Sequence, residues 1–160
     1  MGIDPYGLVV GNWKMKIPGL ILFMTLSSIA FGQNAESLRL TYKGLKQAYK
    51  GHYEKALKYF NAAVVADTND REALFNRGVV LTDLEKYQAG LRDFLKAKSK
   101  GADDAEIYYN LGVAYYGLNR HEHAILNYRK AIELDSKNID YHINLGAALG
   151  EIEKYREAIS

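Results

Sequence analysis

The sequence predicts an all-α fold in which pairs of antiparallel helices stack into a solenoid. The first observation is an internal repeat of 34 residues, and the second is a helical spacing of apolar side chains within each repeat. The third is the composition, since 48% hydrophobic and 25% charged residues with a net charge of +2 are typical of a globular protein. The 160 residues are too few for a (β/α)₈ barrel, and the absence of cysteine excludes disulfides and thiolate zinc sites.

Five columns of small or aromatic residues carry the repeat. The columns are Gly44, Gly78, Gly112 and Gly146; Ala56, Gly90, Ala124 and Ala158; Tyr53, Tyr87, His121 and Tyr155; Phe60, Phe94 and Tyr128; and Ala63, Ala97 and Ala131. Two helices that cross closely need small residues where their backbones meet, and the aromatic columns fill the space beside them. A single hairpin cannot bury its own apolar face, so we expect each unit to complete the core of its neighbour.

The helices of each unit follow from the apolar spacing, which is clearest in the third unit. The first helix there has an apolar face at i, i+3, i+4 and i+7, formed by Tyr108, Leu111, Gly112 and Tyr115. The second has Ala124, Tyr128, Ala131 and Ile132 at i, i+4, i+7 and i+8. A short turn at 118–120 joins the two helices, so the pair is predicted to be antiparallel.

The segments between units are predicted to end in helix caps. Each connector ends in a residue type that accepts a hydrogen bond from an unpaired backbone N–H, namely Asp70, Asp104 and Asn138. An acidic residue follows two positions later, as Glu72, Glu106 and Asp140. Negative charge there suits the positive end of the helix dipole.

These residues together resemble the tetratricopeptide repeat, a 34-residue helix–turn–helix. The resemblance covers residues 37–160, with units at 37–70, 71–104 and 105–138 and a partial unit at 139–160 that we expect to stop partway through its second helix. The late proline of the family pattern is replaced by Thr68, Ala102 and Ser136. The resemblance implies a right-handed superhelix whose concave wall is formed by the first helix of each unit, and it implies protein binding rather than catalysis.

The concave wall supplies the candidate partner-binding residues. An asparagine ladder with the same 34-residue spacing is formed by Asn76, Asn110 and Asn144, and apolar anchors on this wall are Phe75, Tyr109, Tyr116 and Ile143. An amide can pair with the backbone of an extended peptide, and equally it can belong to the family pattern and meet water or a neighbouring helix. Both interpretations of the ladder stay open at this point.

The sequence therefore predicts a non-catalytic interaction module that binds a peptide or protein segment as a scaffold or assembly factor. Some family members clamp the C-terminal carboxylate of heat-shock chaperones with Lys, Arg and Asn. Here those places hold Thr41, Leu45, Glu106 and Asn110, with only Asn76 in agreement, so this partner is not expected. Two alternatives are self-association through the end of the fourth unit and an accessory role within a longer protein.

Enzyme chemistry, cofactors, metals and nucleic acid are not expected. His121 and His123 are two residues apart on a helix and point to different faces, and His52 and His142 are isolated. Neither a His-Glu-x-x-His motif nor a glycine-rich phosphate loop occurs. A nucleic-acid-binding face would need a basic patch that the nearly neutral charge does not provide.

The N-terminal residues predict export. Residues 15–32 have the features of a signal peptide: Lys14 and Lys16 beside it, an apolar stretch at 20–29, and small residues at Ala30 and Gly32 before a cut ahead of Gln33. We expect a periplasmic or extracellular protein, with membrane contact only through this leader. An uncleaved anchor is the alternative. Residues 1–14 are an unassigned leader or an extension upstream of the start at Met15.

Overall fold

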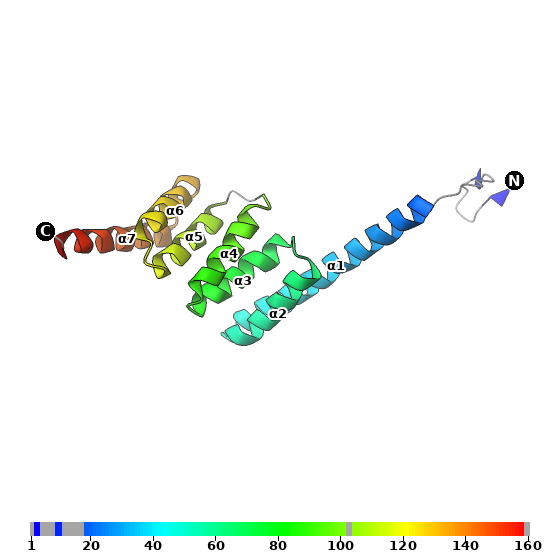
Figure 1. Cartoon of the computed structure of the whole chain (residues 1–160), viewed down its shortest axis with the longest axis horizontal. Coiled ribbons are helices and arrows are strands. Elements are labelled where there is room, and N and C mark those ends of the chain that lie inside the picture. Colours follow the sequence, from blue (N-terminus) through cyan, green and yellow to red (C-terminus); the bar gives the residue numbers. More distant parts are fainter. Residues whose placement is uncertain (1, 4–8, 11–17, 102–103, 159–160) are drawn as a thin grey trace. The chain divides into compact units, whose positions relative to one another are not determined.

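The computed structural model describes residues 2–3, 9–10, 18–101 and 104–158 (Figure 1). The chain divides into two units, Met1–Gly32 and Gln33–Ser160. In the first unit, β1 (Gly2–Ile3) pairs antiparallel with β2 (Val9–Val10), with Gly2 opposite Val10 and Ile3 opposite Val9. Lys14 and Lys16 of the predicted leader lie outside the described residues.

Helix α1 (Pro18–Ala48) contributes residues to both units. Proline suits the first helical position, because its fixed φ is helical and the N–H that it lacks would have no intrahelical partner there. Among the described residues, no helix combines the length and the apolar character needed to cross a bilayer.

The second unit is a solenoid of helix hairpins, as predicted. Its helices after α1 are α2 (Tyr53–Ala66), α3 (Arg71–Asp83), α4 (Tyr87–Lys98), α5 (Ala105–Gly117), α6 (His121–Leu134) and α7 (Ile139–Ala158). Helices α3 and α4 form one hairpin and α5 and α6 the next, each packed on its neighbours in chain order (Figure 1). The 34-residue period thus becomes one hairpin per unit.

The helix starts are capped as the sequence predicts. The Asp70 side chain accepts a hydrogen bond from the backbone N–H of Ala73 at 3.0 Å, and Asp104 accepts one from Ile107 at 2.9 Å. Asn138 accepts from the N–H of Asp140 at 3.0 Å. Each cap therefore fixes the start of a first helix, and with it the register of that helix in the wall.

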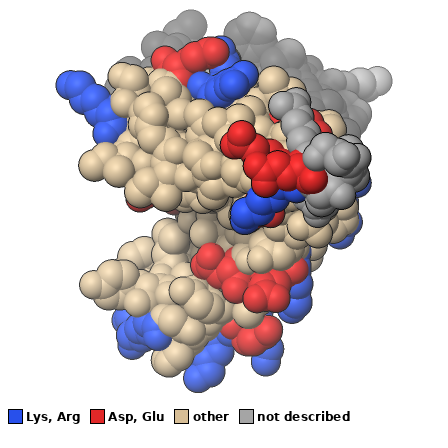
Figure 2. Space-filling model, turned by 90° about the vertical axis from the view of Figure 1, so that its left-hand side faces the viewer, with Lys and Arg blue, Asp and Glu red and all other residues tan. Residues whose placement is uncertain are grey.

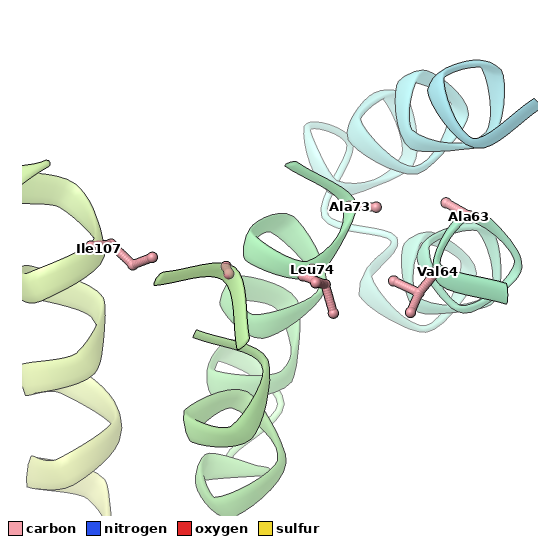
Figure 3. Packing of buried hydrophobic residues seen from close by; sticks show 6 residues of the cluster. Ala63, Val64, Ala73, Leu74 and Ile107 are labelled. Carbon is pink, nitrogen blue, oxygen red and sulfur yellow. The ribbon is translucent and has the colours of Figure 1, made fainter. Parts of the chain in front are cut away.

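The core extends between successive units as well as within each hairpin. Ala63 and Val64 of α2 pack on Ala73 and Leu74 of α3, and Ile107 of α5 belongs to the same buried cluster (Figure 3). Ala63, Ala73, Leu74 and Ile107 are fully buried, at 0% exposure. Stacking of neighbours completes each core, as the repeat pattern requires.

The turns inside the hairpins depend on one residue in the left-handed region. This residue is Gly51 (φ 73°) between α1 and α2, Glu85 (φ 57°) between α3 and α4, and Asn119 (φ 57°) between α5 and α6. The three are 34 residues apart. A residue with positive φ reverses the chain just after a helix end, so the turn has the same construction in each hairpin.

The fourth unit differs from the prediction that residues 139–160 contain a first helix and part of a second. The residue one period after Asn119 is Glu153, and it lies inside the uninterrupted helix α7. Left-handed φ costs a non-glycine residue about 1–2 kcal/mol. Glu153 has a helical conformation within α7 and so avoids this cost, and α7 continues past the position of the turn.

Candidate functional site

The first helices of the units stand side by side and form one wall. Helix α3 contacts α5, and α5 contacts α7. We call the face formed by the exposed sides of α1, α3, α5 and α7 the first-helix wall. Between α3 and α5 this wall has a groove of about 510 Å³ lined by Asp70, Arg71, Glu72, Phe75, Asn76 and Glu106. The structure therefore brings Phe75 and Asn76, two of the predicted residues, together.

The asparagine ladder is held in place by its own helices. The side-chain Nδ2 of Asn76 donates to the carbonyl of Glu72 at 2.8 Å, that of Asn110 to Glu106 at 2.9 Å, and that of Asn144 to Asp140 at 2.9 Å. Each amide thus commits one N–H to the residue four positions earlier. Within the part of the chain that the structure describes, the three Oδ1 atoms accept no protein hydrogen bond, so the ladder offers a row of acceptors to a partner.

Tyr109 is held by neighbours from the next helices. Its ring centroid lies 4.9 Å from that of Tyr141 and 5.9 Å from that of Tyr128. Its hydroxyl accepts a hydrogen bond from Nδ2 of Asn144 at 3.2 Å. Burial and the charge of Asp140 raise the pKa of Tyr109, and the Asn144 bond opposes this. The predicted residues Tyr109 and Asn144 therefore meet, and they join α5 to α7.

The other predicted anchors differ in how much they expose. Phe75 is half-buried and packs on Phe94, with ring centroids 5.8 Å apart. Tyr116 is half-buried and meets His121 edge-on at 5.2 Å. Ile143 is 62% exposed and does not line the α3–α5 groove. Of these three side chains, Ile143 therefore presents the most free apolar surface.

The sequence analysis missed an apolar stripe on α1. The α1 stripe consists of Leu38, Tyr42 and Leu45 on α1 and of Tyr49 in the turn directly after it, which are 53%, 69%, 37% and 95% exposed. The spacing of the first three places them on one face of the helix. They precede Glu72, Asn76, Val79 and Asp83 by one period, so extending the asparagine column backward to Tyr42 would have found them.

The charges of the wall change along its length. Glu72, Glu106 and Asp140 are exposed and follow the helix caps of α3, α5 and α7. Arg71 of α3 forms an ion pair with Asp104, the cap residue of α5. The α1 stripe itself contains no charged residue. The wall therefore runs from an apolar, aromatic end at α1 to a more acidic end at α5 and α7.

The histidines take part in packing and local bonds. His123 stacks on Tyr115 with centroids 5.1 Å apart, His52 lies 3.2 Å from Oε1 of Gln47, and His142 bonds to the carbonyl of Ser136 at 3.1 Å. In the described residues, no group of three or more His, Asp or Glu side chains is arranged to hold a metal ion.

The family models agree with this architecture. Residues 43–101 match one model of the tetratricopeptide repeat, and residues 105–138 match another. The two matches together span more than half of the chain, and this chain belongs to the tetratricopeptide repeat family. Its class is that of a helical-repeat module for protein interaction, whose repeats are generally non-catalytic scaffolds. Among curated proteins, none matches this sequence.

Solved structures share the fold. The first repeat domain of Spaghetti (RPAP3), bound to the HSP90 peptide SRMEEVD, is 22% identical with a TM-score of 0.71, and the match covers 75% of this chain and 95% of that one. MamA (41-end) from Desulfovibrio magneticus RS-1 is 28% identical with a TM-score of 0.70, covering 77% and 70%. YrrB, described as having an unusual peptide-binding site, is 22% identical with a TM-score of 0.67, covering 82% and 68%.

Proposed function

We propose that the first-helix wall binds an extended segment of a partner protein. The observation that carries this proposal is the row of asparagine Oδ1 acceptors, which continues the line of the exposed α1 stripe. Backbone N–H groups of an extended segment are matching donors for such a row. The peptide bound to the RPAP3 domain supports the class of ligand.

The α1 stripe is needed for useful affinity. Three hydrogen bonds at about 1 kcal/mol each sum to roughly 3 kcal/mol, which is less than the roughly 4 kcal/mol of a millimolar complex. Burying one large apolar side chain contributes about 1.5–3 kcal/mol. Tyr42 and Tyr49 are amphipathic and largely exposed, which suits them to be anchors.

The charge of the wall defines the kind of segment. Glu106 on α5 and Asp140 on α7 favour basic or neutral side chains at the α5–α7 end, while the α1 stripe favours apolar or aromatic ones. An acidic segment such as SRMEEVD is disfavoured by the same carboxylates. The proposed ligand is therefore a segment with apolar residues at one end and basic residues at the other.

A display library of random peptides tests this proposal on the full chain. We expect the wild-type protein to enrich segments that combine apolar and basic residues, and a Tyr42→Ser, Asn110→Ala variant to lose them. A matched control is Val65→Ser, because Val65 is 82% exposed but lies on the second helix α2. If the wall variant and the wild type enriched the same peptides equally, the first-helix wall would not be the binding surface.

We further propose that the chain is exported and that its leader is removed before Gln33. The charged, apolar and small residues of 14–32 support this, and the division of the chain into two units at Gly32 and Gln33 is compatible with it. N-terminal sequencing of the exported protein should begin at Gln33. A variant with Ala30→Leu and Gly32→Leu should keep the leader, because the peptidase pocket admits small side chains. Retention of 17–31 in the wild-type protein would indicate an anchor instead.

A further inference from the structure

The two ends of the repeat stack expose surfaces that other units bury. Leu74 and Leu81 of α3 are 0% and 8% exposed. Their counterparts by the 34-residue period are Leu40 on α1, which is half-buried, and Leu149 on α7, which is 42% exposed. Leu40 and Leu149 are therefore covered less completely than their counterparts on α3.

The end at α6 and α7 is an apolar groove with an acidic rim. The groove has a volume of about 880 Å³, and its apolar lining is formed by Ile125, Leu126, Leu149 and Ile152. Leu126 is 63% exposed. The charged side chains that line it, among those the structure describes, are Glu122, Glu153, Glu157 and Arg129. Figure 2 views this end and shows a notch with mostly uncharged walls and Asp and Glu side chains beside it.

The same groove has the place and shape for a helix. In the third unit, the second helix packs against the first, and His123 of α6 stacks on Tyr115 of α5 at 5.1 Å. Leu149 is the counterpart of Tyr115 in the fourth unit. Because α7 continues straight, no described residue of this chain occupies the corresponding position beside Leu149.

The opposite end carries the complementary charge. Between α1 and α2 lies a groove of about 640 Å³ lined by Leu40, Gln47, Lys55, Lys58, Tyr59 and Ala62. This lining has two cations and no acidic residue. Lys55, Lys58, Tyr59 and Ala62 occupy one face of α2 at i, i+3, i+4 and i+7. Within the described residues, neither lysine forms a salt bridge.

We propose that the α6–α7 groove binds the α2 face of a second copy of this chain. Tyr59 and Ala62 of the second copy meet the apolar lining, and Lys55 and Lys58 meet Glu122 and Glu153 on the rim. The two surfaces differ, so the contact is heterologous, and successive copies add head to tail rather than closing as a symmetric dimer. This surface is separate from the first-helix wall.

Sedimentation velocity on the full chain tests the proposal with two charge-reversed variants. One variant is Lys55→Glu, Lys58→Glu, and the other is Glu122→Lys, Glu153→Lys. We expect the mean mass of the wild type to rise with concentration beyond that of a dimer and to fall at high salt. Each variant alone should associate at least about tenfold more weakly than the wild type, because like charges then face each other. A mixture of the two should associate again, because each offers a complementary end to the other.

Three results would overturn the proposal. One is a wild-type chain that stays monomeric at its highest soluble concentration. A different segment would then be the ligand of the α6–α7 groove. Another is a mass that saturates at that of a dimer. The last is association that survives both charge reversals, as association through the apolar residues 20–29 would. A Leu95→Ser variant serves as the control, because Leu95 is 46% exposed on α4 and lines neither groove, so its self-association should equal that of the wild type.

Discussion

Gly78 of α3 lies directly against the ring of Phe94 on α4. A β-carbon at position 78 would be 2.6 Å from Cε1 of Phe94, which is closer than non-bonded carbons approach. Gly44 faces Phe60 and Gly112 faces Tyr128 in the same way. The glycine column and the aromatic column of the sequence are therefore the two sides of one repeated contact, which sets how closely the helices of a hairpin approach.

Replacing Gly78 by alanine should destabilise the protein. Overpacking against the fully buried ring of Phe94 costs about 1–3 kcal/mol, and alanine recovers about 1 kcal/mol of helix propensity. The expected net loss in the free energy of unfolding, measured by urea titration, is up to about 2 kcal/mol. Gly146 is the matched control, since a β-carbon there meets nothing within 4 Å. Gly146→Ala should therefore stabilise, and equal effects at both positions would contradict this account.

Removing only one partner of the ion pair between Arg77 and Asp93 should lower the free energy of unfolding substantially. Both guanidinium contacts are short, with Nε at 2.6 Å and Nη2 at 2.8 Å from the carboxylate, and the side chains are only 20% and 10% exposed. Asp93→Ala leaves a partly buried cation and should cost about 3 kcal/mol of unfolding free energy.

A double variant separates the cost of the unpaired charge from the value of the pair. One period later the same two places hold Leu111 and Asn127. Arg77→Leu with Asp93→Asn copies that arrangement and should recover most of the loss, because no charge is then left unpaired. If the double variant were as unstable as Asp93→Ala, the loss would have another origin.

Stability should fall at alkaline pH because of Tyr128. Its side chain is 1% exposed, and burial, followed by the nearby Tyr109 and Tyr116, raises its pKa. A folded pKa above the unfolded value of about 10 means that the contribution is present below pH 10 and is lost as pH rises above it. The loss is about 1.4 kcal/mol per pH unit for one such tyrosine.

Tyr128→Phe tests this origin of the pH dependence. Phenylalanine already occupies the same column at Phe60 and Phe94, so the variant should fold with similar stability at pH 7. Chemical denaturation between pH 9 and pH 11 should show a shallower decline than in the wild type, by up to about 1.4 kcal/mol per pH unit. If the variant lost unfolding free energy with pH as steeply as the wild type, residues other than Tyr128 would cause the loss of stability at alkaline pH.

The hairpin turn offers a further test at Glu85. With φ at 57°, a non-glycine residue there carries a conformational cost that glycine avoids. Glu85→Gly should raise the thermal midpoint, with a gain of about 0.5–1 kcal/mol. The matched control is Glu153→Gly, which should instead lose about 1 kcal/mol, because Glu153 lies within the helix α7. The opposite order would mean that the turn conformation is not strained.

The repeated columns were enough to predict the hairpins, their order and their caps, because each column reports a contact that recurs in every unit. The straight course of α7 could not be predicted in this way, since Glu153 is the same residue type as Glu85, which has left-handed φ at the corresponding place two periods earlier. The α1 stripe was missed because Lys43 and Gln47 break the apolar pattern of the first unit, while Tyr42 is not an asparagine. The hydrogen bonds from the asparagine amides to the carbonyls of their own helices could not be predicted either, because a repeated residue type does not show which rotamer its side chain adopts.

Helix α7 is anchored unevenly along its length. Tyr141 and Ala148 in its first half are 6% and 0% exposed, whereas Glu153, Lys154 and Glu157 in its second half are exposed. Local unfolding should therefore begin in that second half and proceed while α3 to α6 remain intact. In amide hydrogen exchange, residues 152–158 should lose protection first, so the acidic end of the stack is also the part of the solenoid that melts most readily.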